Sequence, residues 1–383
     1  MYQTRKEMLK DLRQMRAYKA CKVHKAHKAR SNEEGFILIT VLLVIALLFP
    51  LVLAFNSKVQ LNLTQAENFR NSVQALRMAR AGVEGAMGIL EQGDQTYDSR
   101  RSIWASNFPS FSPTEGGVLT VSINDEDGKL PINNVITVAS PTPANKGGTT
   151  QTAAANPAQT AAANPAQNTA GSTGTTTAAA EDVNQIVVTQ VKSLISQFGG
   201  RPEITDALID WIDADSIVTG SEGAEEDYYK PLGYHCKNGL LDSVDELLLI
   251  RGFDRELVID KSLKDYVTIA PTSGGINVNT APLEVLKAVV GTQTGQLVQP
   301  LSESDIENLV QYRDQHDLKT INDITGAVKI SQTQLSSVSS LLKVKSSYFT
   351  ASSRYTIGKV VKNVEALLKR DGSTVTIISW REF

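Results

Sequence analysis

A run of twenty uncharged residues, 36–55, constrains the fold of this chain more than any other feature. Because an α-helix rises about 1.5 Å per residue, the run covers roughly 30 Å, which is the thickness of the hydrocarbon core of a bilayer. A secretory signal peptide has a shorter apolar centre, of about 7 to 15 residues, followed by small residues at its cleavage site. The run shows neither property, so we expect a membrane-spanning helix that the protein keeps.

The charges on either side of the run predict its orientation. Ten lysines and arginines lie between Arg5 and Arg30, whereas the residues after Phe55 mix Lys58 with Glu67 and many uncharged polar groups. Positively charged flanks stay in the cytoplasm. We therefore expect a single-pass protein with a cytoplasmic N-terminus and most of its chain on the far side of the membrane.

The helix is expected to continue beyond the apolar run. Pro50 removes one helix hydrogen bond inside the run, which a membrane helix tolerates. Apolar side chains then recur near helical spacing over residues 56–92 and end before Gly93. We expect one helix from Phe36 to about Gln92, transmembrane in its first part and amphipathic in its second.

The start of this helix resembles the prepilin-like proteins, a class that includes type IV pilins and the pseudopilins of type II secretion. The resemblance rests on a basic leader over residues 1–35, on Gly35 directly before Phe36, and on the apolar run with its amphipathic continuation. It implies that a prepilin peptidase cuts between Gly35 and Phe36 and that the new N-terminal phenylalanine is methylated. The alternative is a plain single-pass anchor with a basic cytoplasmic tail.

One position departs from the pattern of this class. Most members carry a glutamate at the fifth position of the mature chain, where its charge can pair with the terminal amine of a neighbouring subunit inside an apolar helix bundle. In this chain the position is Thr40. A subunit without the carboxylate cannot supply this pairing, which predicts a place at the tip of a filament.

After the helix, residues 93–139 are expected to begin a pilin-like α/β domain. The sequence predicts two short strands there, 118–124 and 129–132, joined by the acidic turn of residues 125–128. Residues 140–180 consist almost entirely of small and polar residues, and the octamer TAAANPAQ occurs twice within them. This composition predicts a disordered loop.

The rest of the chain divides into a helical part and a strand part. Residues 181–345 contain short amphipathic segments with helix starts at Ser243, Pro282 and Ser302. Residues 346–383 alternate between apolar and polar side chains, which predicts two or three antiparallel strands that turn at Asp371-Gly372. The predicted fold class is α+β: a pilin-like long N-terminal helix packed on an antiparallel sheet, with a large, mostly helical domain inserted into the sheet region.

A cluster of acidic residues lies inside the helical part. Residues 202–229 contain nine aspartates and glutamates and no lysine or arginine. Carboxylates gathered around a turn repel one another unless a hard cation joins them, and calcium accepts six to eight such oxygens. The stretch has no histidine and no cysteine, which disfavours zinc. Calcium is therefore the expected metal, and the alternatives are a solvated acidic loop or a carboxylate pair for glycoside hydrolysis.

Four sequence segments, in order, make the resemblance more specific. They are LIDWIDAD, GAEEDYY, LLDSVDELLLIRG and INVNTAPLEVLKAV. Together with the N-terminal helix they resemble the general secretion pathway protein K family, the large minor pseudopilins of the type II secretion system. Members of this family also commonly lack the glutamate at the fifth position of the mature chain.

The resemblance implies a subunit that forms or caps the tip of the periplasmic pseudopilus and initiates its assembly for export of folded proteins across the outer membrane. It implies an inner-membrane protein of a Gram-negative bacterium with a periplasmic globular part. The implied partners are the minor pseudopilins I and J, the major pseudopilin, the prepilin peptidase and the inner-membrane secretion platform.

The resemblance also implies one or two calcium ions in the inserted domain. Asp213 and Asp215 match the acids of the family's WIDAD element, and Glu225 matches the acid of its GAED element. Which of Glu226 and Asp227 takes part is open at this stage. The candidate metal ligands are Asp213, Asp215, Glu222, Glu225, Glu226 and Asp227.

Three other functions compete with this interpretation. The first is a minor tip subunit of a type IV pilus. The second is a membrane-anchored helix-hairpin-helix DNA-binding protein, since INVNTAPLEVLKAVVG resembles such modules. The segment that follows, residues 291–305, carries no lysine or arginine, so no nucleic-acid partner is expected. The third is an enzyme, which is not expected because no nucleophile and base pair is suggested, and Cys236 is expected to be an inert thiol.

Overall fold

A computed structural model describes residues 3–106, 108–113, 116–138, 181–272, 275–293 and 295–383. The predicted disordered loop, 140–180, lies outside the described residues. The chain forms two compact units, Met1–Gln74 and Ala75–Phe383.

The first unit consists of the N-terminal part of one helix. Helix α1 (Gln3–Gln92) begins well before Phe36, where the sequence predicted its start. The leader is helical because it is rich in lysine, arginine, alanine and leucine and contains no proline or glycine before Gly35. Residues 36–92 of α1 are long and apolar enough to cross a membrane.

Two polar features of the apolar run are accommodated inside the helix. Pro50 lies within α1, as predicted. The hydroxyl of Thr40 donates a hydrogen bond of 2.8 Å to the carbonyl of Ile37, one turn earlier. The helix backbone thereby satisfies the polar atom of Thr40.

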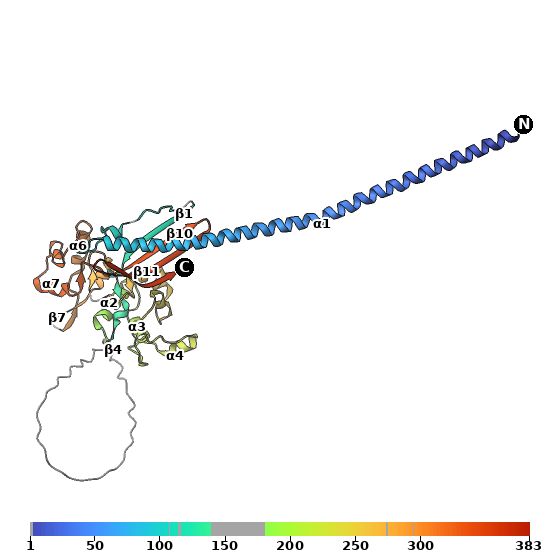
Figure 1. Ribbon diagram of the computed structural model, residues 1–383. Helices are drawn as coiled ribbons and strands as arrows, with labels where there is room; N and C mark the ends of the chain where they lie inside the picture. Colours follow the sequence, from blue (N-terminus) through green and yellow to red (C-terminus); the bar gives the residue numbers. More distant parts are fainter. Residues whose placement is uncertain (1–2, 107, 114–115, 139–180, 273–274, 294) are drawn as a thin grey trace, which may run out of the picture. The chain divides into compact units, whose positions relative to one another are not determined.

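The second unit contains an antiparallel sheet that packs on the last turns of α1. Its strands are β1 (Gly117–Asp125), β10 (Tyr348–Ile357), β11 (Val360–Asp371) and β12 (Thr374–Glu382), in the order β1-β10-β11-β12. Figure 1 shows the end of α1 lying across this sheet. A side chain at Gly82 would collide with Ser353, so the absence of a side chain there lets the helix pack closely on the sheet.

The remaining part of the second unit is inserted between β1 and β10, and we call residues 126–347 the inserted lobe. Its helical elements are η2 (Ile132–Val135), α2 (Gln185–Gln197), η3 (Pro202–Ile204), α3 (Thr205–Ile212), α4 (Glu226–Tyr229), η4 (Lys230–Leu232), η5 (Val244–Leu249), η6 (Glu256–Asp260), η7 (Leu263–Asp265), α5 (Leu283–Ala288), α6 (Glu303–Arg313), η8 (Ile321–Gly326) and α7 (Gln332–Ser339). Its strands are β2 (Leu130–Pro131), β3 (Ile136–Val138), β4 (Glu181–Val183), β5 (Val267–Thr268), β6 (Ile276–Asn277), β7 (Gly291–Gln293), β8 (Gln296–Val298) and β9 (Leu342–Lys343). One short helix, η1 (Ile103–Ala105), precedes the sheet. This arrangement confirms the predicted fold class.

Local predictions in the inserted lobe hold where the sequence carries a capping signal. Helix α6 starts after Ser302, whose side chain accepts a hydrogen bond from Asp305, and the two residues form a capping box. Helix α5 follows Pro282. The segment after Ser243 was predicted to be an ordinary helix, and it is instead the short 3₁₀ helix η5, a form common in connectors.

The pairing of the two strands around the acidic turn differs from a hairpin. Strand β1 ends at Asp125, but it pairs with β10, so that Asp125 lies opposite Phe349. Strand β2 is only Leu130–Pro131, and it pairs in parallel with β5. The acidic turn therefore joins the sheet to the inserted lobe.

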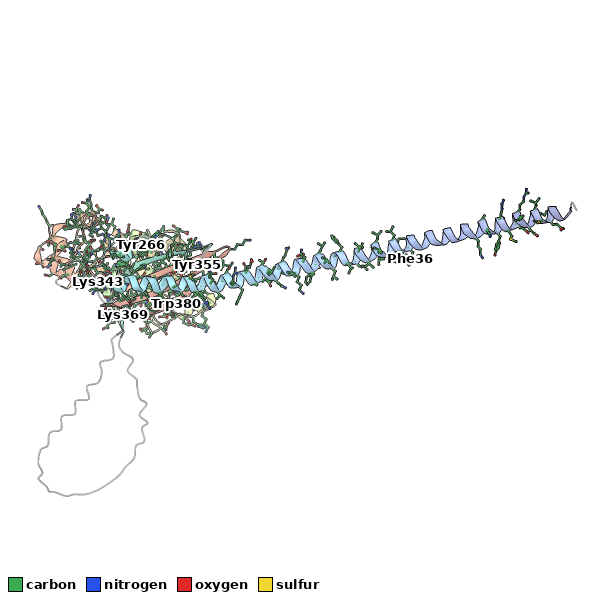
Figure 2. All side chains as sticks on the ribbon, turned by 45° about the horizontal axis from the view of Figure 1, so that its top comes forward. Phe36, Tyr266, Lys343, Tyr355, Lys369 and Trp380 are labelled. Carbon is green, nitrogen blue, oxygen red and sulfur yellow. The ribbon has the colours of Figure 1, made fainter. Side chains whose placement is uncertain are left out.

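The second unit contains two separate hydrophobic cores. One core lies between α1 and the sheet and includes Val83, Leu90 and Phe349. The other fills the inserted lobe and includes Leu194, Leu208 and Tyr229. Figure 2 shows the side chains of both regions on the ribbon.

Candidate metal centre

The predicted metal ligands lie in and around a loop that follows helix α3. All eight residues of this helix are buried, because its apolar side chains enter the core of the inserted lobe. Asp206 and Asp210, one turn apart on this helix, point toward the loop. The Asp210 carboxylate accepts hydrogen bonds from the Thr219 amide at 3.0 and 3.2 Å, and Asp206 accepts one from the Ser221 amide at 3.2 Å. Two aspartates of the helix thus hold the loop by its backbone.

Two glycines let the loop pack against these carboxylates. Gly220 has a φ of +58°, which disfavours any other residue, and a side chain there would collide with Asp206. A side chain at Gly223 would collide with Asp210 and with the backbone of Thr219. The shape of the loop therefore depends on its small residues.

Three of the six predicted ligands come together in this loop. Asp213, Asp215 and Glu225 each offer a carboxylate oxygen, and these oxygens lie within 4.8 Å of one another. Asp213 and Glu225 are buried, and Asp215 is exposed. Three carboxylates at this separation form a donor set suited to a hard cation such as calcium, which would take its remaining ligands from carbonyls or water.

The surroundings of Glu225 test whether a cation fits here. Both of its carboxylate oxygens are buried, and no conventional donor within the described residues bonds to either of them. Burial, followed by the charges of Asp210 and Asp215, raises the pKa of Glu225 above its usual range, and the nearby Cys236 thiol and Glu226 amide oppose this. A buried carboxylate whose charge is disfavoured by burial and by neighbouring acids is costly unless a cation compensates it. The three residues fit a bound cation.

The other three predicted ligands lie outside this group. Glu222 forms ion pairs with Arg201 at 2.9 Å and with Arg251 at 3.3 Å. Glu226 accepts hydrogen bonds from His235 at 2.6 Å and from the Cys236 amide at 3.2 Å. The sequence did not indicate these pairings, because the partner residues lie outside the acidic stretch.

Asp227, the last predicted ligand, is an exposed residue of the short helix α4. Asp210 was not a predicted ligand, and the structure makes it the residue that fixes the loop. In the sequence, Asp210 could have been noticed because it lies one turn after Asp206 and three residues before Asp213.

The Cys236 thiol donates to the Asp210 carbonyl. Burial raises the pKa of this thiol to about 11, so the thiol stays protonated.

The segment that resembles a DNA-binding module uses its arginine internally. Arg313, at the end of α6, is buried and donates to the carbonyls of Val278 and Ala281. Burial lowers its pKa to about 10. The guanidinium group therefore fastens the loop before α5 and is not presented to a phosphate.

Comparisons with known proteins agree on one family. A family model described as type II secretion system (T2SS), protein K, matches residues 159–272, and a second of the same description matches residues 276–345. The type II secretion system protein K of Pseudomonas aeruginosa is 25% identical over 310 residues, covering 77% of each chain. That of Pectobacterium carotovorum is 24% identical over 360 residues, covering 91% of this chain and 96% of its own.

A solved structure has the same fold. It is the crystal structure of the GspK-GspI-GspJ complex from the type 2 secretion system of enterotoxigenic Escherichia coli. The matched chain is 18% identical, with a TM-score of 0.60, and the match covers 83% of this chain and 99% of that one.

Proposed function

Because this chain belongs to the type II secretion system protein K family and is thus a minor pseudopilin, we propose that it forms the tip of the periplasmic pseudopilus. Thr40 carries this proposal. A filament whose subunits pair a glutamate with the neighbour's amine needs that carboxylate in every repeating subunit, and Thr40 offers only a hydroxyl that is bonded to Ile37. A subunit without the carboxylate fits at an end, where it can initiate assembly and no further subunit follows it.

The place in the filament can be observed directly. Pseudopili assembled in cells are labelled with antibody against the inserted lobe and viewed by electron microscopy. We expect label at one end of each filament and failure of assembly when the subunit is deleted. Label along the whole length would contradict the proposal.

The proposed partners are the minor pseudopilins I and J, with the major pseudopilin below them. Support comes from the similarity to a chain solved in a GspK-GspI-GspJ complex. The test is affinity purification of the full chain from detergent-solubilised inner membrane. Recovery with I and J is expected, and recovery with type IV pilus subunits instead would favour the pilus alternative.

We also propose that prepilin peptidase removes residues 1–35 and that Phe36 is then methylated. The mature protein would sit in the inner membrane through residues 36–55, with its second unit in the periplasm. Mass spectrometry of the membrane-extracted protein should find an N-terminus at methylated Phe36. An intact leader in cells that contain the peptidase would exclude this processing.

The proposed cofactor is calcium, held by Asp213, Asp215 and Glu225. Its chemistry there would be structural, because a cation joins the two ends of the loop that Asp206 and Asp210 hold in the middle. The full chain in detergent, freed of divalent cations, should bind calcium in equilibrium dialysis and bind magnesium more weakly, since magnesium loses its water less readily. Equal retention of both ions, or of neither, would argue against the site.

A further inference from the structure

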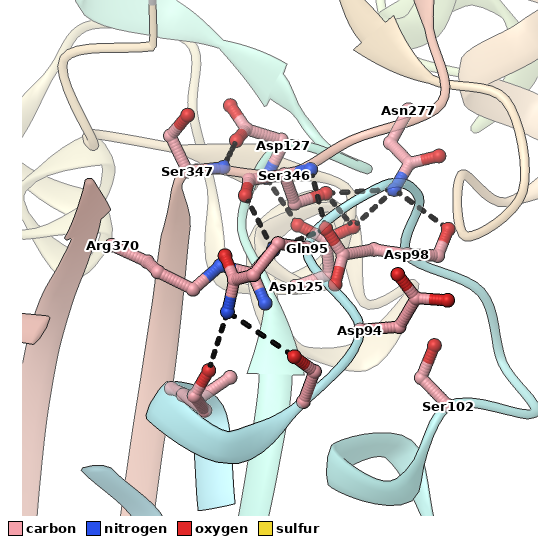
Figure 3. Close-up of polar contacts among 12 residues, drawn as sticks. Asp94, Gln95, Asp98, Ser102, Asp125, Asp127, Asn277, Ser346, Ser347 and Arg370 are labelled. Carbon is pink, nitrogen blue, oxygen red and sulfur yellow. Dashed lines mark hydrogen bonds and ion pairs between the residues drawn. The ribbon is translucent and has the colours of Figure 1, made fainter. Parts of the chain in front are cut away.

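The junction between the sheet and the inserted lobe is built from buried polar groups. The chain leaves the sheet after Asp125 and returns at Tyr348, and the Glu126 amide donates to the Tyr348 carbonyl at 3.0 Å. The exit and the return therefore lie side by side, with one hydrophobic core on either side of them. Figure 3 shows the side chains that fill the space between. We call Asp98, Asp125 and Asp127, all buried, the junction carboxylates.

Two of the junction carboxylates each form an ion pair with a cationic side chain. Asp98 forms a buried ion pair with Arg370 of strand β11 and accepts hydrogen bonds from the Ser346 amide at 2.8 Å and the Trp104 indole at 2.9 Å. Asp127 forms an ion pair of 2.9 Å with Lys343 and accepts a hydrogen bond from the Tyr348 amide at 3.1 Å. The negative charges of Asp98 and Asp127 are therefore each balanced by a directly bonded cation.

Among the described residues, Asp125 is compensated only by neutral donors. One of its carboxylate oxygens accepts from the Asp127 amide at 2.9 Å. The other accepts from the Asn277 amide group at 3.0 Å, the Thr280 hydroxyl at 2.5 Å and the Ser346 hydroxyl at 2.6 Å. All of these donors lie in the inserted lobe, so Asp125 is where the end of a sheet strand holds that lobe.

The remaining cations near Asp125 are engaged elsewhere. Lys129 pairs with Glu126 at 2.8 Å, and Arg100 donates to the carbonyls of Thr280 and Ala281. Three carboxylates thus share Arg370 and Lys343 at the junction, and the excess negative charge falls on Asp125.

A cavity connects this site to solvent. Its volume is about 500 Å³, and Asp125, Thr280, Arg100, Lys129 and Asp265 are among the residues that line it. Water can carry a proton through such a cavity to the carboxylate. The junction therefore has a group that can change charge, a path for the proton, and a set of hydrogen bonds that depends on the charge.

We propose that Asp125 is a proton-controlled latch that fixes the inserted lobe against the sheet. In the ionised form its two oxygens accept every donor around it. A proton taken up from solvent removes this uncompensated buried charge, and the new hydroxyl can donate to the Thr280 or Ser346 hydroxyl, each of which accepts as well as donates, so the lobe is held more firmly. This proposal does not rest on the place of the subunit in the filament.

The expected pH range follows from the surroundings of Asp125. Burial, then the charge of Asp127 and more weakly that of Asp98, raises its pKa from 3.8 to about 7, against the donors of Ser346 and Thr280. A raised folded-state pKa means that the folded chain binds a proton that the unfolded chain has already released. The stability of the fold, and with it the attachment of the lobe, therefore rises as the pH falls through about 7.

The test uses the full chain in detergent at constant calcium. Its melting temperature is measured from about pH 8 to about pH 5, together with hydrogen exchange of peptides that contain residues 277–280 and 343–348, corrected for the intrinsic pH dependence. We expect the melting temperature to increase on acidification with a midpoint near pH 7, and exchange of these peptides to become slower. A wild-type protein without this transition would overturn the proposal.

Three variants assign the transition to Asp125. Asp125→Asn, which is neutral like the protonated carboxyl, should lose the pH transition and show slow exchange of the junction peptides at every pH. Asp265→Asn, which changes an exposed acid lining the same cavity, should behave as wild type. Ser346→Ala removes one donor to the ionised carboxylate and should move the midpoint to higher pH, which provides a second test if Asp125→Asn fails to fold. A transition that persists in Asp125→Asn, or a midpoint that Ser346→Ala leaves unmoved, would refute the latch.

Discussion

Two groups of three neighbouring carboxylates among the described residues differ in how their charge is balanced. The metal-centre group, Asp213, Asp215 and Glu225, comes from one short loop whose sequence supplies no lysine or arginine. The junction carboxylates come from separate parts of the chain, and Arg370 and Lys343 reach them from distant strands.

The difference explains why equal residue types lead to different chemistry. Carboxylates that are close in sequence share their surroundings, so a protein cation rarely reaches all of them and a metal ion can replace it. Carboxylates brought together by tertiary structure meet the other elements that converge there, and these elements supply arginine, lysine and hydroxyl groups. The first group is the proposed calcium site, and the second is part of the structural framework.

The largest expected effect comes from removing the cation of the junction. Arg370→Met leaves Asp98 buried without its ion-pair partner, which typically costs about 3–5 kcal/mol of unfolding free energy. Denaturant unfolding of the full chain in detergent should show this loss. The double variant Asp98→Leu/Arg370→Met should recover much of it, because the uncompensated charge is then gone.

Arg354→Met is the control for this prediction, since Arg354 lies exposed on the neighbouring strand β10. It should change the unfolding free energy by less than about 0.5 kcal/mol. If Arg370→Met were equally mild, the junction carboxylates would not depend on a protein cation, and the contrast between the two groups would fail.

The next largest effect tests whether the metal-centre group depends on calcium, where the junction carboxylates depend on cations of the protein. In wild type, calcium at a hundredfold excess over its dissociation constant should add about 2.7 kcal/mol to the unfolding free energy. Glu225→Gln should abolish most of this gain. Without calcium the variant should be more stable than wild type, because it removes a charge that burial and the charges of Asp210 and Asp215 disfavour. The measurement is the melting temperature with calcium and with chelator.

Asp227→Asn is the matched control, because Asp227 is acidic, two residues away and exposed. It should keep the full calcium response. A response that Glu225→Gln leaves intact, or one that Asp227→Asn removes, would mean that the ion binds elsewhere in the acidic stretch.

The same contrast shows what the sequence could predict. The apolar run, the amphipathic continuation and the capping box at Ser302 and Asp305 are local signals, and the elements they predict are present. The family was also recognisable, because its acidic elements are contiguous in the chain, and the comparisons confirm it. The metal-centre group was visible for the same reason, although the structure gathers only three of the six predicted ligands.

The junction could not be predicted, because no local pattern joins Asp98, Asp125 and Arg370. The turn that contains Asp125 has the composition of an exposed hairpin, and only the pairing of β1 with β10 makes it a buried connection. Likewise, Arg201 and Arg251 lie outside the acidic stretch, so their pairing with Glu222 was not apparent. In both places the partners of the carboxylates come from distant parts of the chain, so only the tertiary structure reveals them.

The smallest expected effect concerns an exposed arginine–carboxylate pair, whose comparison with the buried pair of Arg370 tests the role of burial. Arg80 on α1 forms a two-point ion pair with Glu382 of β12, with distances of 2.8 and 3.1 Å, and both side chains are solvent-accessible. The pair raises the pKa of Arg80 and lowers that of Glu382, yet solvent screens such pairs and they contribute little to stability.

Arg80→Met should therefore leave the unfolding free energy nearly unchanged, and the small change should shrink further at high salt. The comparison with Arg370→Met holds the chemistry constant, an arginine and a carboxylate between elements far apart in the chain, and varies only the exposure. If Arg80→Met proved as damaging as Arg370→Met, the arginine–carboxylate contact itself would set the cost, and burial would not be what distinguishes the junction.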